Sequence, residues 1–180
     1  ISTHKMIDLL YNQENIAGPL AEFVSLVVER QSASFAIEFI KDLKKQVFLT
    51  NSSHDTIAIK NIAKFLQKLS KRAPKAVYLS IGELLFLFDC EAYLLRQSLI
   101  KILANTIIYV LRQPDIIQGE DGMADYAQME ETGRVCEKNR MQFLDMLMRR
   151  FLDKSAFCRI KVMKVFTRLT EENLVPRYMY

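Results

Sequence analysis

The residues that could perform acid–base chemistry in this chain are few and dispersed. Its two histidines, His4 and His54, are isolated from one another and stand near expected helix starts. General-base catalysis needs a second group positioned beside the imidazole, and the sequence places no such group near either histidine. We therefore expect a solvent-facing or capping role for both.

Three carboxylates, on Asp89, Glu91 and Asp153, could be mistaken for a catalytic acid and base. Asp89 and Asp153 each stand at a turn that precedes an amphipathic stretch. A cap at such a place stabilises the following helix by about 1 kcal/mol. Capping and ion pairing therefore explain these acids more economically than catalysis does.

Cofactor and metal chemistry also lack a sequence signature. Cys90, Cys136 and Cys158 have neither metal-ligand nor redox spacing, and three cysteines give no complete disulfide framework. Buried thiols in a reducing compartment are the expected state. There is no glycine-rich phosphate loop. We predict that the chain is not an enzyme and has no cofactor, no metal site and no small-molecule substrate.

Two basic helix faces are candidates for binding phosphate groups. No acid occurs between Asp55 and Glu83, where the first face lies, and the second face lies near the C-terminus. Lysines without interleaved aromatic residues would contact phosphates and read little base sequence. Each face could equally be an ordinary solvated surface. The first face is Lys60, Lys64, Lys68, Lys71, Arg72 and Lys75, and the second is Lys154, Lys161, Lys164 and Arg168.

The composition predicts that helices position these residues. The chain has 180 residues, of which 50% are hydrophobic and 26% charged, with five glycines, four prolines and a net charge of +4. This balance is typical of a soluble globular protein, and so little turn chemistry favours an all-α fold over a sheet. The longest apolar run, Leu84 to Phe88, is far below the roughly 20 residues of a membrane span, so no membrane partner is expected.

Hydrophobic periodicity predicts the helices and one long loop. Thr3 is expected to cap the first helix, and Gly82 is expected to let a neighbouring helix approach closely. Gln113 to Gly133 carries six acids and no base, which predicts an acidic loop over 113–133. The predicted helices are a short one that begins at Thr3 and ends near 12–15, followed by 20–30, 34–47, 57–71, 74–88, a stretch after Asp89 to Leu111, 134–152 and 155–169.

Two of these helices carry an arginine on their apolar side. Arg96 falls in the middle of the apolar face of its helix, and Arg159 lies at the edge of the arc near Met163 and Phe166. A buried guanidinium keeps its charge, so it must be paired or cost several kcal/mol, on the order of the buried-ion penalty. Val162, Phe166 and Leu169 are the expected core of the second helix.

The stretches around these arginines also repeat one another. Phe88-Asp89-Cys90-Glu91-Ala92-Tyr93 leads to Arg96, and Leu152-Asp153-Lys154-Ser155-Ala156-Phe157 leads to Arg159 with one residue fewer. A helix, a turn bearing Asp and a second helix with an inward Arg is the pattern of HEAT repeats. We predict an all-α HEAT-type solenoid of stacked antiparallel helix pairs, with its clearest repeats at 74–112 and 134–170 in one segment over 1–180.

The amino-acid sequences of both stretches resemble the N-terminal region of the condensin subunit 1 family. Glu91-Ala-Tyr93-Leu-Leu-Arg96-Gln-Ser-Leu99 and Leu152-Asp153-Lys-Ser-Ala-Phe157-Cys-Arg159 carry the resemblance, which is clearest over about 74–169. The family comprises large HEAT subunits that regulate SMC ATPases in mitotic chromosome condensation. In HEAT families the inward Arg commonly meets the turn Asp of an adjacent repeat, which implies structural ion pairs among Asp89, Arg96, Asp153 and Arg159.

The resemblance implies a non-enzymatic scaffold whose partners are a kleisin subunit, SMC ATPases and double-stranded DNA bound without sequence preference. It shifts the interpretation of both basic faces toward DNA contact and implies a location in the nucleus and on chromosomes, with part of the cell cycle in the cytoplasm. The start without Met and the end after Val175-Pro176 suggest a segment of a longer protein. A related SMC-associated HEAT subunit, or an importin- or adaptin-like transport adaptor, also fits.

Overall fold

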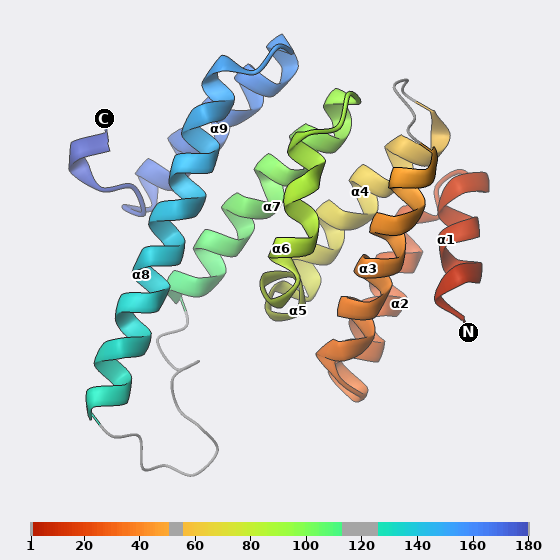
Figure 1. Cartoon of the computed structure of the whole chain (residues 1–180), viewed down its shortest axis with the longest axis horizontal. Coiled ribbons are helices and arrows are strands. Elements are labelled where there is room, and N and C mark those ends of the chain that lie inside the picture. The colour runs from red at the N-terminus through yellow and green to blue at the C-terminus, as the bar shows by residue number, and fades with distance from the viewer. Residues whose placement is uncertain (1, 51–55, 113–125, 180) are drawn as a thin grey trace. The chain divides into compact units, whose positions relative to one another are not determined.

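A computed structural model describes residues 2–50, 56–112 and 126–179 of the chain (Figure 1). All regular structure in these ranges is helical and packs as a repeat-like array, so the prediction of an all-α helical-repeat fold is confirmed. The elements are α1 (Thr3–Asn12), α2 (Ala17–Arg30), α3 (Ala33–Thr50), α4 (Ile57–Arg72), α5 (Pro74–Leu79), α6 (Ile81–Leu84), η1 (Leu85–Phe88), α7 (Tyr93–Arg112), α8 (Tyr126–Arg149), η3 (Arg150–Leu152), α9 (Ala156–Glu171) and η4 (Arg177–Met179).

The chain divides into two compact units, Ile1–Asn105 and Thr106–Tyr180, which we call unit 1 and unit 2. The boundary falls inside α7, so this helix contributes to both units. Whether residues 1–180 form one continuous HEAT segment stays a prediction.

The core of unit 1 is built around α4, which packs against α1, α2 and α5. Ile62, Phe65, Leu66 and Leu69 recur at helical spacing and are almost fully buried. The ring of Phe65 meets that of Phe39 from α3, with ring centroids 5.2 Å apart. Burial of each such side chain stabilises the fold by about 1.5–3 kcal/mol. The opposite side of α4 is left for solvent and carries the first basic face.

The helix predicted over residues 74–88 is wrong as a continuous element, because it is divided into α5, α6 and η1. The break falls at Ser80, whose hydroxyl donates to the carbonyl of Ala76 at 2.8 Å. A serine that bonds its own preceding turn competes with regular helical geometry. The close approach predicted at Gly82 is also wrong, because a Cβ there would meet no atom within 4 Å.

The prediction that Thr3 caps the first helix is wrong. Ser2 is the N-cap residue, and Thr3 Oγ1 donates to Asp42 Oδ2 of α3 at 2.9 Å. This bond ties α1 to α3. At the start of α4, Thr56 acts as a true cap, because its side chain accepts from the Ile59 amide at 3.3 Å.

In unit 2, helix α8 begins at Tyr126, so the prediction of a loop is wrong for residues 126–133. Ala127, Gln128, Met129 and Glu130 are strong helix formers, and Gly133 alone does not outweigh them. Residues 113–125, the rest of the predicted acidic loop, lie outside the described part of the chain.

The buried face of α9 also differs from its prediction, although Val162 and Leu169 belong to the core as expected. Cys158 and Val165 complete that core, whereas Phe166 is only half-buried and Met163 is 53% exposed. The core therefore lies on the opposite side of the helix from Met163.

Helix α7 is the one element of the described chain that is long and apolar enough to cross a membrane, over Tyr93–Leu111. Of this window, 67% is buried inside the protein. A helix covered by its own protein in this way is typical of a core helix.

Candidate functional site

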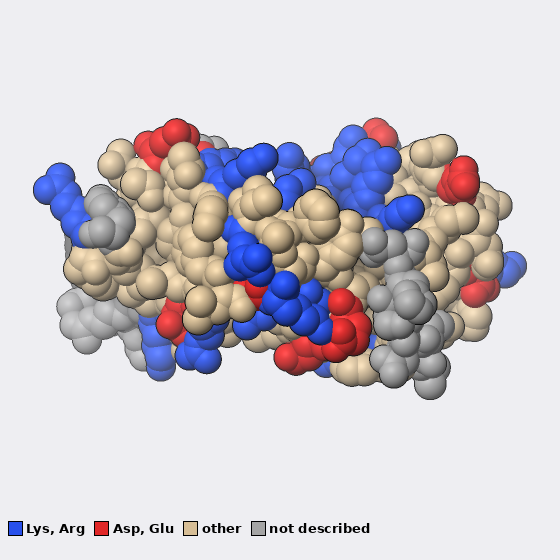
Figure 2. Space-filling view, turned by 90° about the horizontal axis from the view of Figure 1, so that it is seen from above, with Lys and Arg blue, Asp and Glu red and all other residues tan. Residues whose placement is uncertain are grey.

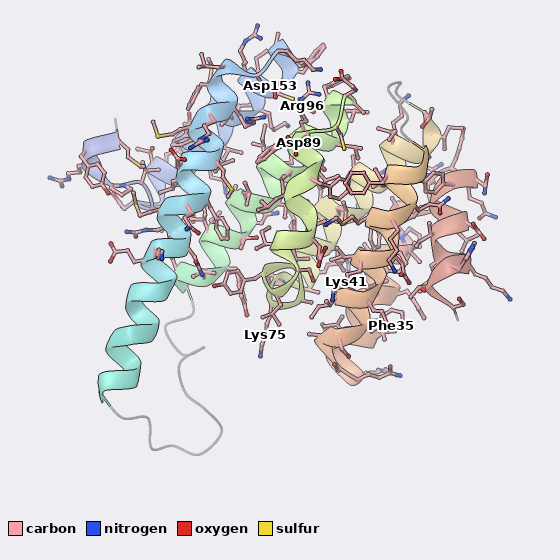
Figure 3. The ribbon with its side chains drawn as sticks, in the orientation of Figure 1. Phe35, Lys41, Lys75, Asp89, Arg96 and Asp153 are labelled. Carbon is pink, nitrogen blue, oxygen red and sulfur yellow. The ribbon has the colours of Figure 1, made fainter. Side chains whose placement is uncertain are left out.

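Arg96 closes the turn that leads into α7. Its side chain is buried, with 3% exposed, and Nη1 donates to the carbonyls of Cys90 and Glu91, both at 2.7 Å. Figure 3 labels Arg96 and Asp89 at this turn. A guanidinium is suited to this task because its donors lie in a fixed plane and stay charged.

Arg159 repeats the arrangement at the turn that leads into α9. Its Nη1 donates to the carbonyls of Asp153 at 2.7 Å and Lys154 at 3.2 Å. In both copies the arginine therefore binds the carbonyls six and five residues before it. This shared geometry makes the sequence echo a structural repeat.

The arginine contacts align Asp153 with Cys90, one residue later than the Asp89 that the sequence echo suggested. The two acids accordingly differ: Asp153 is buried, and its Oδ1 accepts from the Ser155 amide at 2.8 Å, whereas Asp89 is exposed. Asp153 Oδ2 also lies 3.8 Å from Nη1 of Arg150. The pairing of either arginine with the turn Asp of another repeat stays a prediction.

Cys90 lies in the Arg96 turn as a half-buried thiol whose Sγ donates to the Phe86 carbonyl at 3.7 Å. Burial and then the charge of Asp89 raise the pKa of this thiol to about 11, while Arg96 acts in the opposite direction. A thiol with so high a pKa is uncharged at neutral pH and hence a poor nucleophile or metal ligand.

The first basic face forms a row along the solvent side of α4 and continues onto α5. Lys60, Lys64, Lys68, Lys71 and Lys75 are exposed and form no ion pair with another described residue. Lys75 points away from α5 in Figure 3. We call these five residues the lysine row. Figure 2 shows Lys and Arg side chains gathered in groups on one face of the molecule.

Two contacts with α2 modify this row. Arg72 Nη2 lies 3.7 Å from Glu22 Oε2, so the sixth predicted member already has an acidic partner. Lys68 lies against Gly18, where an added Cβ would stand 2.7 Å from its Nζ. The sequence missed Glu22 as a partner because it lies 50 residues away on another helix.

The second basic face is less uniform. Lys164 is exposed, Lys161 is half-buried, and Arg168 Nε lies 3.3 Å from Glu172 Oε1. The exposed apolar residues Phe157, Ile160 and Met163 are interleaved with these cations on α9. The surface therefore combines charge with apolar area, unlike the lysine row.

Two asparagines matter to unit 1 and were not singled out from the sequence. Asn61 is buried beside the lysine row, and its Nδ2 donates to the carbonyls of Leu10 at 2.9 Å and Gln13 at 2.7 Å. Asn105 donates from Nδ2 to Ser70 Oγ at 2.9 Å. Only the tertiary arrangement reveals either role.

No group of three or more His, Cys, Asp and Glu side chains in the described ranges could hold a metal ion. His4 Nδ1 lies 3.2 Å from Asp8 Oδ2 on the exposed side of α1, and His54 lies outside the described residues. The two side chains are 81% and 58% exposed, so this pair lies in solvent at the surface of the helix.

The fold and its two arginine-closed turns define this chain as an all-α helical-repeat protein with a lysine row on its surface. No protein-family model matches the chain. Its sequence does match a region of condensin complex subunit 1, which confirms the resemblance inferred from the repeated stretches.

Three relatives illustrate the match. The chain is 27% identical over 176 residues to condensin complex subunit 1 of Mus musculus, covering 97% of this chain and 11% of the relative. It is 31% identical over 157 residues to condensin complex subunit 1 of Schizosaccharomyces pombe, covering 87% and 12%. The condensin-1 complex subunit CAP-D2 of Arabidopsis thaliana is 28% identical over 121 residues, covering 67% and 8%. The chain thus spans about a tenth of the length of these relatives.

Proposed function

We propose that this chain is a non-enzymatic scaffold segment of a condensin complex that supports mitotic chromosome condensation. The observation that carries the proposal is the match to condensin complex subunit 1 over 97% of the chain. The helical-repeat fold supports it, since such arrays present extended surfaces to partners. ATP hydrolysis would belong to the SMC ATPases of the complex. A kleisin subunit would be a further partner, and the protein would act in the nucleus and on chromosomes, and in the cytoplasm for part of the cell cycle.

The contact that this segment would make itself is with the backbone of double-stranded DNA, through the lysine row. Five exposed lysines on one helix face and its extension offer point charges for phosphates and no fork for reading bases. Binding would therefore be independent of sequence and strongly dependent on salt. We assign the DNA contact to the lysine row rather than to Arg72 or Arg168, because each of these arginines already has an acidic neighbour.

A charge-reversal experiment tests the DNA contact. Lys60→Glu, Lys64→Glu and Lys68→Glu are combined in one variant, and its affinity for duplexes of two unrelated sequences is measured by fluorescence anisotropy across salt concentrations. We expect weaker binding to both duplexes. The slope of log K against log salt should flatten by up to about 0.9 for every phosphate that is no longer neutralised.

A control with the same change in net charge separates a local contact from overall electrostatics. Lys5, Lys41 and Lys138 are exposed and lie outside the lysine row, so Lys5→Glu, Lys41→Glu and Lys138→Glu together form the matched variant. Equal loss of affinity in both variants would remove the row from consideration. Binding to a nuclear-import GTPase or cargo peptide, with no duplex binding by the unaltered protein, would favour a transport adaptor instead.

A further inference from the structure

Unit 1 contains a small pocket beside the turn that Arg96 closes. Its volume is about 120 Å³, and α3, α4, η1 and α7 all contribute to its lining. Val47, Ile59 and Leu95 form the apolar part of that lining and are 7%, 3% and 1% exposed. Sites for small-molecule ligands usually have about 300–1,000 Å³, so this pocket has room for one side chain rather than for a cofactor.

Two aromatic rings also line the pocket. Phe48 and Phe86 pack with ring centroids 4.8 Å apart and planes inclined by 32°. Phe48 is 59% exposed, so its ring is accessible from solvent. The chain already places one cation on this pair, because Lys44 Nζ lies 5.8 Å from the centroid of the Phe86 ring. Aromatic faces attract cations, and the cation is more often a guanidinium than an ammonium group.

The charged residues that line the pocket are both acids, Asp89 and Glu91. Both are exposed, and Asp89, labelled in Figure 3, forms no ion pair with another described residue. Two cations lie near the pocket without lining it. Lys44 pairs with Glu83 at 3.0 Å, and Arg96 donates to two carbonyls of the turn. The charge at the pocket itself is therefore negative.

These features fit a basic occupant with a flat head group. The phosphates of DNA would be repelled by the carboxylates, and a lysine ammonium has no plane to stack on a ring. We propose that the pocket binds an arginine side chain of a partner protein, with its guanidinium stacked on Phe48 and donating to the carboxylate of Asp89. Glu91 adds to the negative potential. The inference does not depend on the DNA contact proposed above, because it concerns different residues and a ligand of opposite charge.

Methyl NMR of the chain with ¹³C-methyl-labelled Ile, Leu and Val tests the site directly. The probe is a synthetic seven-residue peptide with one central Arg between Ala, Ser and Gly residues, and its matched control has citrulline, which is uncharged and of similar shape, in place of Arg. The arginine peptide should shift the methyl signals of Val47, Ile59 and Leu95 and leave that of Leu147, buried in unit 2, unchanged. The citrulline peptide should bind at least fivefold more weakly.

Three substitutions at exposed positions separate a local contact from overall charge. Phe48→Ala and Asp89→Asn should each weaken binding of the arginine peptide at least threefold, whereas Glu29→Gln, which removes one negative charge from α2, should leave it unchanged. Equal binding of both peptides, or no shift of the pocket methyls, would overturn the proposal. Self-association that Phe48→Ala abolishes would also overturn it, because the occupant would then be a second copy of this chain.

Discussion

Arg96 shows how one buried side chain can hold a turn and a helix together. Its guanidinium donates to two partly buried carbonyls at 2.7 Å, and without it each of these carbonyls loses a charged donor. Because hydrogen bonds from charged groups contribute about 1.5–3 kcal/mol, we expect Arg96→Ala to lower the free energy of unfolding by about 2–4 kcal/mol. Urea denaturation followed by circular dichroism measures this change.

Substitutions of Arg159, in the second repeat, and of a surface lysine serve as controls for Arg96→Ala. Arg159 makes the same pair of contacts with one longer bond and is less buried, so Arg159→Ala should destabilise the protein less. Lys64→Ala, on the exposed row, should change the unfolding free energy by no more than about 0.5 kcal/mol. Equal midpoints for all three variants would contradict the structural role of the arginines.

Cys90 provides a prediction about pH. Its pKa is raised to about 11, chiefly because burial disfavours the thiolate and secondly because of Asp89. Its alkylation by iodoacetamide should therefore be slow at pH 8 and keep rising with pH until about 11, whereas in urea it should level off near pH 9. Since the unfolded thiol ionises first, the stability that Cys90 contributes is full below pH 9 and lost as pH rises through 11. Mass spectrometry of the Cys90 peptide measures the rate, and a plateau near pH 9 in the folded protein would contradict this.

For individual residues, the sequence predicted which side chains matter better than it predicted their exact alignment between the two repeats. The need to pair a charged group on an apolar helix face was enough to single out Arg96 from the sequence. The equivalent of Asp153 was misplaced by one residue, because turns of unequal length hide which carbonyls an arginine reaches. The Arg72–Glu22 pair could not be predicted at all, since no periodicity relates residues on α2 and α4.

At the scale of the elements, the C-terminal end of α1 is held by hydrogen bonds from a side chain of α4. Asn61 donates to the carbonyls of Leu10 and Gln13, which have no later turn of α1 to bond with. Since leaving buried acceptors unsatisfied costs about 1–3 kcal/mol, Asn61→Ala should lower the unfolding free energy by that amount and speed amide exchange in α1. Hydrogen exchange with mass spectrometry would report both effects.

The same helix contains its own control. Asn12 also donates from Nδ2 to a carbonyl of α1, that of Asp8 at 2.9 Å, but this bond is exposed. Water can replace it, so Asn12→Ala should leave exchange in α1 within about twofold of the unaltered protein, as expected of a surface substitution. If both asparagine variants behaved alike, burial of the Asn61 bonds would not be what anchors α1.

Elements were predictable wherever one apolar face is clear. Ile59, Ile62, Leu66 and Leu69 repeat at helical spacing, so α4 was predicted to within one residue at its C-terminal end. The stretch from Pro74 to Phe88 is strongly apolar, with Lys75 and Glu83 as its only charged residues, and such a pattern does not say where a helix breaks. Ser80 marks the break through a hydrogen bond that only the folded backbone makes possible.

At the scale of the whole chain, the two compact units share one helix, α7, because the boundary between the units falls inside it. Repeat proteins generally derive their stability from each repeat and its neighbour rather than from a single centre. The sequence indicated the repeats, but the unit boundary inside α7 has no glycine, proline or charge cluster to reveal it. Local stability should therefore follow local packing more than distance along the chain.

Paired core truncations make this expectation testable. Leu66 in unit 1 and Leu147 in unit 2 are both almost fully buried, and Leu→Ala at such sites costs about 2–5 kcal/mol. We expect Leu66→Ala to speed amide exchange chiefly in α2 and α4, and Leu147→Ala to do so chiefly in α8 and α9, with α7 responding to both. Hydrogen exchange resolved by peptide measures the pattern. A uniform loss of protection over all helices in either variant would mean that the chain unfolds as one cooperative unit, and would contradict the division at Asn105 and Thr106.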